Sequence, residues 1–168
     1  VFRLSGATAG KGTITGLRII APANATALAG MDVDIPLELA SAVSLDSANL
    51  RSMRIDLRYD PRLMRPDAVT ANVPGLTASF TERSPGATTI QIISDRPIKE
   101  ASPLVSLKAR TYVGPLRTTV LDVDTVTAPG AIITGDDGQL SLETDCQINA
   151  SAVGLVRPIV FRTHLVDG

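Results

Sequence analysis

The segment that most constrains the fold is the run RSMRIDLRYD, residues 51–60. Its apolar side chains fall on alternate positions, namely Met53, Ile55, Leu57 and Tyr59. Polar or charged residues occupy the positions between them. Because successive side chains of a β-strand point to opposite faces, this pattern predicts a strand with one buried and one wet side. Asp60 and Pro61 follow, and these residue types favour the cap and first position of a short helical turn.

Similar short segments recur along the chain between Pro and Gly turn signals. Besides 51–60, we expect strands at 17–21, 31–40, 76–82, 88–94, 104–113, 117–126, 132–133 and 139–143, and a short extended piece at 68–72. About nine short strands with turn signals every ~8–12 residues are typical of an all-β antiparallel sandwich or barrel. We favour the β-sandwich, because clean alternation leaves one face of each sheet wet.

Three local features carry more specific expectations. Residues 24–30 are small and polar and are interpreted as a turn. Pro36 has no N–H to donate, so its strand is expected at a sheet edge or with a bulge. Residues 135–138, Gly-Asp-Asp-Gly, favour a tight hairpin between the strands that flank them.

The totals exclude some classes of function. Sixteen Lys and Arg oppose 17 Asp and Glu, so there is no basic footprint for nucleic acid. No apolar run reaches the ~18 residues of a membrane span, and we expect no membrane insertion. Cys146 is the only cysteine, so an internal disulfide is impossible.

The chain is expected to hold one domain. We assign residues 17–145 to the sandwich, 1–16 to a linker or edge segment, and 146–168 to a C-terminal extension. The extension is either an extra strand or a link to a next module. Because the sequence opens with VFRLSG and no Met, we interpret the chain as a processed protein or a piece of a longer one.

Catalytic and cofactor chemistry finds little support. The single histidine, His164, lies near the end of the chain, so neither a His-bearing metal cluster nor a Ser-His-Asp arrangement is expected. Four aspartates resemble a calcium site at first sight, namely Asp122, Asp124, Asp136 and Asp137. Calcium, however, needs six to eight converging oxygens. We therefore expect no enzyme, no cofactor and no metal. Carbohydrate binding stays open, although aromatic residues are only 3% and Trp is absent.

The order of these pieces resembles cohesin domains and their cohesin-like relatives in bacterial extracellular proteins. The matching pieces are Gly30-Met-Asp32 leading into Val-Asp-Ile-Pro-Leu, Leu-Arg-Tyr-Asp-Pro-Arg-Leu-Met (57–64), Leu-Val-Ser-Leu-Lys-Ala (104–109) and Gly-Asp-Asp-Gly-Gln-Leu-Ser-Leu (135–142). The resemblance spans about residues 17 to 145, and the Tyr-Asp-Pro-x-Leu element is its most distinctive part.

This resemblance implies a nine-stranded jelly roll, an extracellular or cell-surface location, and a non-catalytic module that binds a protein partner of the dockerin type. The family's contact surface includes the strands matching 51–60 and 88–94. Carried onto this chain, the partner-binding candidates are Arg54, Asp56, Arg58, Gln91 and Ile93. Two alternatives remain: a structural spacer or assembly domain held through its end segments, and a carbohydrate-binding module. The charged residues Arg54, Asp56 and Arg58 would also be explained by a solvated sheet face with weak cross-strand pairs.

Overall fold

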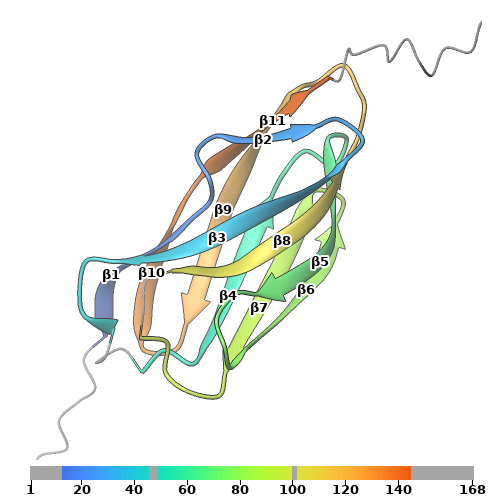
Figure 1. Cartoon of the computed structure of the whole chain (residues 1–168). Coiled ribbons are helices and arrows are strands. Elements are labelled where there is room, and N and C mark those ends of the chain that lie inside the picture. Colours follow the sequence, from blue (N-terminus) through green and yellow to red (C-terminus); the bar gives the residue numbers. More distant parts are fainter. Residues whose placement is uncertain (1–12, 46–48, 100–101, 145–168) are drawn as a thin grey trace, which may run out of the picture.

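The structure is a computed structural model, and it describes residues 13–45, 49–99 and 102–144. Eleven strands are found in these residues (Figure 1). They are β1 (Ile14–Ile20), β2 (Ala25–Leu28), β3 (Asp32–Ser41), β4 (Ser52–Arg58), β5 (Met64–Ala71), β6 (Leu76–Ser84), β7 (Ala87–Ser94), β8 (Pro103–Thr111), β9 (Thr118–Ala128), β10 (Ala131–Asp136) and β11 (Gly138–Glu143).

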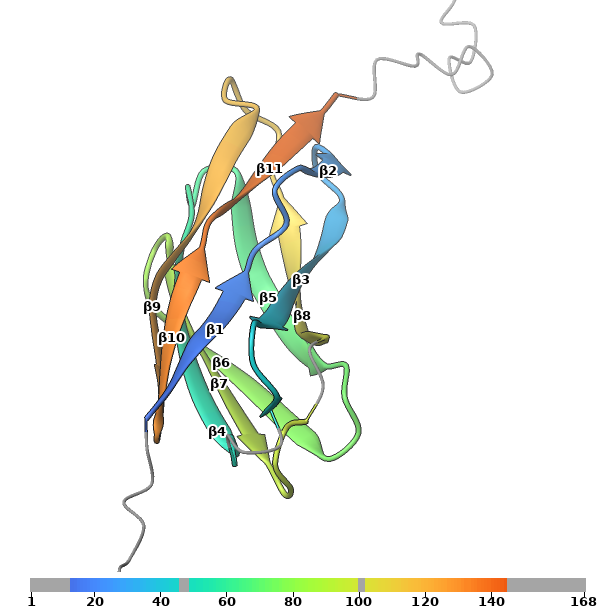
Figure 2. The ribbon, with the colours of Figure 1, turned by 90° about the vertical axis from the view of Figure 1, so that its left-hand side faces the viewer.

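The strands form two packed layers. Their hydrogen-bonded order is β5-β8-β3-β1-β10-β9-β4-β7-β6, with β11 pairing to both β9 and β2. In Figure 1 the β3–β8–β5 layer crosses in front of the β9–β4–β7–β6 layer. Figure 2 shows β1 beside β10 where the path turns from one layer to the other. The predicted all-β sandwich is confirmed.

The core lies between the layers and is almost entirely aliphatic. Each of the main strands contributes its alternate residues, including Ile55 and Leu57 from β4, Ile90 and Ile92 from β7, and Leu107 from β8, all at most 1% exposed. Tyr59 is also buried, and its hydroxyl lies 3.1 Å from the Thr88 hydroxyl. Burial on one side of each strand therefore explains the period of two in the sequence.

The sequence predicts a turn at residues 24–30, but the structure has a strand there. Ala25–Leu28 form β2, which pairs in parallel with β11, Ala25 lying opposite Leu140. A second parallel ladder joins β1 to β10. The remaining ladders between the described strands are antiparallel. Leu140 and Leu142, the β11 residues opposite Ala25 and Ala27, are buried.

The hairpin expected at residues 135–138 is wrong. β10 pairs with β9 and β1, whereas β11 pairs with β9 and β2, so the chain shifts between neighbours here instead of reversing. The Asp137 carboxylate accepts a hydrogen bond from the Val123 N–H at 2.9 Å, where the ladder to β9 is interrupted. A side chain at Gly135 would collide with the Val123 carbonyl, which explains the glycine at this crossing.

Pro36 behaves partly as expected. β3 is an interior strand of the path, but β1 pairs only with residues 38–41 of it, so the β3 backbone is bonded only to β8 at Pro36. The register with β8 shifts directly afterwards, between Leu37 and Glu38. A residue without an N–H therefore occurs where the strand is locally an edge and close to an irregularity.

The segment after β4 forms one turn and not a helix. The Asp60 carbonyl accepts from the Leu63 N–H at 3.0 Å, and the Asp60 carboxylate accepts from the Arg62 N–H at 2.9 Å. The capping role of Asp60 is thus present, but β5 begins at Met64 and pairs with β8. β1 begins at Ile14, before the expected Leu17. Cys146, His164, the extension 146–168 and most of segment 1–16 lie outside the described residues, and the proposed domain boundaries stay predictions.

Candidate functional site

The outer face of the β9–β4–β7–β6 layer carries all five predicted partner-binding residues. β4 lies between β7 and β9, with its residues 53, 55 and 57 buried and Arg54, Asp56 and Arg58 on the opposite side. On β7, Gln91 and Ile93 are exposed beside them. We call the outward side chains of β6, β7, β4, β9 and β10 the outer face.

Cross-strand register places these side chains in rows. Arg54 lies directly opposite Gln91 of β7 on one side and Thr127 of β9 on the other. The row continues to Ser79 of β6 and to Ile132 of β10. All five side chains are exposed, so the row crosses five strands without a buried member. Ile93 lies opposite Ser52 and is 54% exposed, so it adds an apolar side chain to this face.

Asp56 is the centre of a charged cluster. Its carboxylate accepts hydrogen bonds from the Thr89 hydroxyl at 2.6 Å and from the Arg54 guanidinium at 3.3 Å, and it forms an ion pair with Arg83 at 2.6 Å. The side chain is only 13% exposed. Burial raises the pKa of Asp56, but the bonds from Thr89, Arg54 and Arg83 together outweigh it, so the pKa of this carboxyl is lower than usual. Asp56 is therefore charged at neutral pH and holds both arginines.

A second pair adjoins this cluster. Arg58 donates to the Asp124 carboxylate at 2.8 Å, and this bond raises the pKa of Arg58 further. Asp124 lies at a register shift of β9, between the partners of Asp56 and Leu57. Asp122 faces Arg58 across the ladder, and burial together with its neighbours Asp137 and Asp124 raises the pKa of Asp122. The charges of the outer face are thus largely balanced within the face itself.

Two shallow hollows flank this charged strip. One, of about 290 Å³, is lined by Ser52, Met53, Arg54, Gln91, Thr127, Ala128 and Pro129. The other, of about 420 Å³, is lined by Asp56, Leu57, Arg58, Arg83, Ser84, Ala87, Asp124 and Thr125. Arg54 and Arg58 each border one hollow, so a side chain of a partner that entered either hollow would meet a guanidinium group.

Sequence reasoning missed several members of the site. Arg83 lies at the irregular end of β6, where the register to β7 shifts between Glu82 and Ser84, and no local pattern indicates that it reaches Asp56. Asp124 was considered only as a calcium ligand. Thr89 was placed correctly on the wet side of β7, but its bond to Asp56 depends on the pairing of the two strands.

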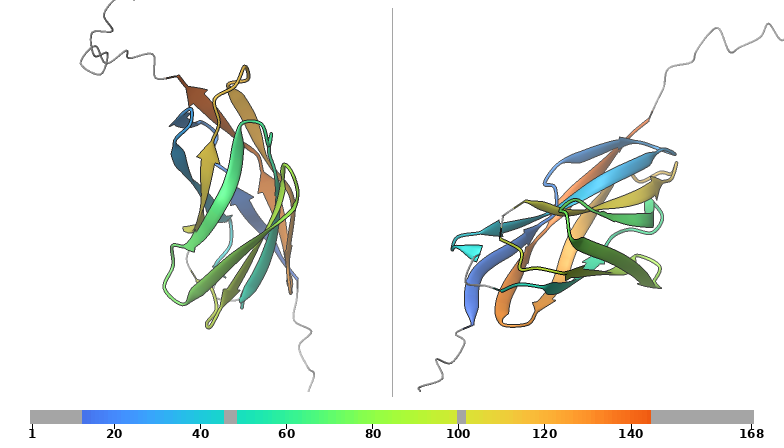
Figure 3. Two further views of the ribbon diagram at one scale, coloured as in Figure 1. Left: turned by 90° about the vertical axis from the view of Figure 1, so that its right-hand side faces the viewer. Right: turned by 60° about the horizontal axis from the view of Figure 1, so that its bottom comes forward.

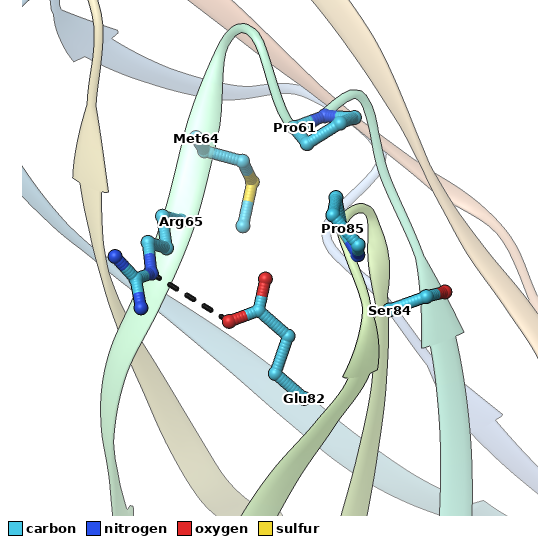
Figure 4. Close-up of a pocket in the computed structure, with 6 residues that line it drawn as sticks. All are labelled: Pro61, Met64, Arg65, Glu82, Ser84 and Pro85. Atoms are coloured by element: carbon cyan, nitrogen blue, oxygen red, sulfur yellow. Dashed lines mark ion pairs between the residues drawn. The ribbon is translucent and has the colours of Figure 1, made fainter.

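Another hollow lies away from the outer face, between β5 and β6 (Figure 4). It measures about 470 Å³ and is lined by Pro61, Met64, Arg65, Glu82, Ser84 and Pro85. Figure 3 (left) views the molecule from the side on which β5 and β6 lie in Figure 1. Arg65 and Glu82 form an ion pair at 3.6 Å across the opening. These two charged groups already neutralise one another.

Three of the four aspartates that resemble a calcium site have other partners. Asp136 pairs with Arg18 at 2.8 Å, Asp124 pairs with Arg58, and Asp137 caps a backbone N–H. Within residues 13–45, 49–99 and 102–144, no group of three His, Cys, Asp or Glu side chains is placed to hold a metal ion. In the same residues, no helix is long and apolar enough to cross a membrane.

Comparison with solved structures identifies the fold. A chain of the type I cohesin–dockerin complex Coh-OlpC–Doc435 from Clostridium thermocellum superposes with a TM-score of 0.65 at 14% identity, over 79% of this chain and 96% of that one. The seventh ScaB type I cohesin from Pseudobacteroides cellulosolvens gives 0.64 at 12% identity, over 90% and 100%. A non-cellulosomal cohesin from the archaeon Archaeoglobus fulgidus gives 0.60 at 16% identity, over 82% and 96%.

These likenesses show that the chain has the cohesin fold, and the described strands form a cohesin-like domain. No protein-family profile matches the sequence, and no curated protein matches it. At identities this low the shared property is the fold, and function has to be argued from the site.

Proposed function

We propose that this domain is a non-catalytic protein-binding module of a secreted or cell-surface bacterial protein, and that its outer face binds a partner of the dockerin type. The observation that carries the proposal is the row of exposed side chains across five strands, with Arg54 at its centre and exposed Ile93 close by. Arginine is one of the residues enriched where interfaces gain most of their energy.

The solved neighbours support a partner of this type. Several were determined as cohesin–dockerin complexes, including two from Clostridium thermocellum and a complex of CaCohA2 with a variant of CaDoc0917. The surface offered here differs from a simple charged patch, because Asp56 and Asp124 already neutralise the arginines. Recognition would therefore rest on hydrogen bonds and apolar contact with Ile93 and Ile132, with modest dependence on salt.

The proposal is tested by calorimetric titration of the domain with a panel of calcium-loaded dockerin modules. For a dockerin that binds, Arg54→Glu and Arg58→Glu should each weaken binding at least tenfold, since each places a repulsive charge in the contact surface. Arg110→Glu is the matched control: Arg110 has comparable exposure and pairs with Asp32 at 3.2 Å, but on the outer side of the other layer. Unchanged affinity of both outer-face variants would remove this face as the binding surface.

A structural role is the second candidate, and the internal charge balance of the outer face favours it. A face whose ions are paired among themselves is also what a solvated spacer would present. If the domain is an assembly unit held through its ends, removal of 1–15 or of 146–168 should disrupt assembly and leave the sandwich folded. Size-exclusion chromatography and circular dichroism of the two shortened chains distinguish this outcome from dockerin binding.

A further inference from the structure

An apolar patch lies at one end of the sandwich, outside the outer face. Its members come from the end of β2, the β2–β3 turn and the β8–β9 loop, and we call them the end patch: Leu28, Met31, Val113 and Leu116. Their exposures are 43%, 57%, 77% and 39%, and Val113 is the most exposed of the large apolar residues described. Exposed apolar side chains that gather at one end of a domain mark a candidate contact surface.

Buried Thr111 fixes the two loops against each other. Its hydroxyl lies within hydrogen-bond distance of the Leu28 carbonyl at 2.8 Å and the Met31 carbonyl at 2.7 Å, and it accepts from the Met31 N–H at 3.1 Å. Val113 packs over the same turn, because a Cβ at Gly30 would lie 3.6 Å from a Val113 methyl. These bonds fix the β2–β3 turn against the end of β8, next to Val113.

The last described strand ends beside this patch. Glu143 of β11 lies opposite Leu28, and its carbonyl accepts from the Ala29 N–H at 2.8 Å. Arg117, which follows Leu116, donates to the Thr144 hydroxyl at 3.2 Å. Figures 1 and 2 show the end of β11 beside β2. Whatever follows Thr144 in the chain therefore starts next to the end patch.

The sequence that follows contains an apolar run of the right kind. Residues 155–161 read LVRPIVF, with five large apolar side chains in seven positions. Leu155 lies eleven residues after Thr144, and eleven extended residues reach up to about 36 Å, more than enough to return to the end patch. A tethered segment also has an effective concentration on the order of millimolar, which favours it over a second copy.

We propose that the segment 155–161 docks on the end patch of its own domain and covers Met31 and Val113. The segment would act as a strap that joins the C-terminal extension rigidly to the sandwich. The proposal does not depend on partner binding at the outer face, which is built from other strands.

Methionine methyl NMR on the full chain tests this directly, because the three methionines differ in exposure. Met31 is 57% exposed in the described domain, whereas Met53 and Met64 are buried at 2% and 0% and serve as internal references. Phe161→Asp should move the Met31 methyl signal and leave the other two in place. Ser151→Asp, in the same extension but outside the apolar run, should move none of the three.

Limited trypsin digestion gives a second measurement, in which the end patch is changed and cleavage of the C-terminal segment is followed. Val113→Asp, at an exposed position that a charge does not unfold, should raise the rate of cleavage after Arg162 several-fold, because the strap is released. An unchanged Met31 signal in Phe161→Asp overturns the proposal. A Met31 signal that changes with protein concentration also overturns it, because a second copy would then cover the patch.

Discussion

The substitution Asp56→Asn tests whether the charged cluster around Asp56 stabilises the folded domain. The Asp56 carboxylate is 13% exposed and receives Thr89 at 2.6 Å, Arg83 at 2.6 Å and Arg54 at 3.3 Å. Asparagine keeps one oxygen for Thr89 but loses the charge that holds the arginines. Charge-assisted hydrogen bonds contribute about 1.5–3 kcal/mol when sheltered, and exposed ion pairs about 0–1 kcal/mol.

The two arginine side chains are each 48% exposed, so their share has to be discounted for solvent screening. We expect Asp56→Asn to lower the free energy of unfolding by about 1–2 kcal/mol at pH 7, which combines two screened pairs with one weakened sheltered bond. For a chain of this size, that corresponds to a fall in Tm of roughly 2–8 °C.

The pH dependence gives the sharper test. Because the pKa of Asp56 is lowered in the folded protein, its stabilising contribution is complete above the unfolded value of about 3.9 and is lost as the pH falls through the folded value. The difference between wild type and Asp56→Asn should therefore be constant from pH 7 to about pH 5 and should shrink below about pH 4.

Urea unfolding followed by circular dichroism measures both effects. Asp124→Asn is the matched control, because Asp124 pairs with the exposed Arg58 at 2.8 Å, and its loss should lower the stability much less than Asp56→Asn does. Equal stability of Asp56→Asn and wild type at pH 7 would refute the reasoning, as would a difference that persists unchanged in acid.

Ile55→Ala should lower the free energy of unfolding by about 2–5 kcal/mol, since this side chain is fully buried between the layers; a loss below 1 kcal/mol in urea unfolding would place it outside the core. Gly135→Ala should destabilise by roughly 2 kcal/mol or more, because its Cβ would collide with a backbone carbonyl of β9. Gly114→Ala, with open space around it, should be near neutral in the same assay; equal effects of the two would contradict the close approach. Carboxyl NMR titration should give Asp60 a pKa of about 2, because Arg62 donates to its carboxylate from both side chain and backbone. Arg62→Ala should move that pKa toward 3.8. A pKa near 3.8 in the wild type would contradict the turn.

Local sequence pattern predicted the parts of the fold that depend on burial alone. β4 and β7 alternate because one side of each faces the core, and that constraint is visible within ten residues of sequence. β2 was missed because its status as a strand depends on a partner more than 100 residues later, Ala25 lying opposite Leu140. The false hairpin at residues 135–138 has the same cause, since a local turn signal does not reveal that β10 and β11 have different neighbours.

The candidate site also has a part that the sequence predicts and a part that it does not. The outward direction of Arg54, Asp56, Arg58, Gln91 and Ile93 follows from parity, and the structure places all five on one face. Their pairing does not follow from parity, because it requires the register between strands. The contact of Arg83 with Asp56 could not be predicted, since a register shift in β6 brings it within reach.

The most direct test of the central claim is amide chemical-shift mapping of the domain with a dockerin that binds it. If the outer face is the contact surface, the largest shifts should cluster on β4, β7 and the adjoining parts of β6 and β9, around Arg54 and Gln91. The amides of β3 and β8 should hardly move. Shifts that cluster on β3 and β8, or around the end patch, would contradict the assignment of the binding surface.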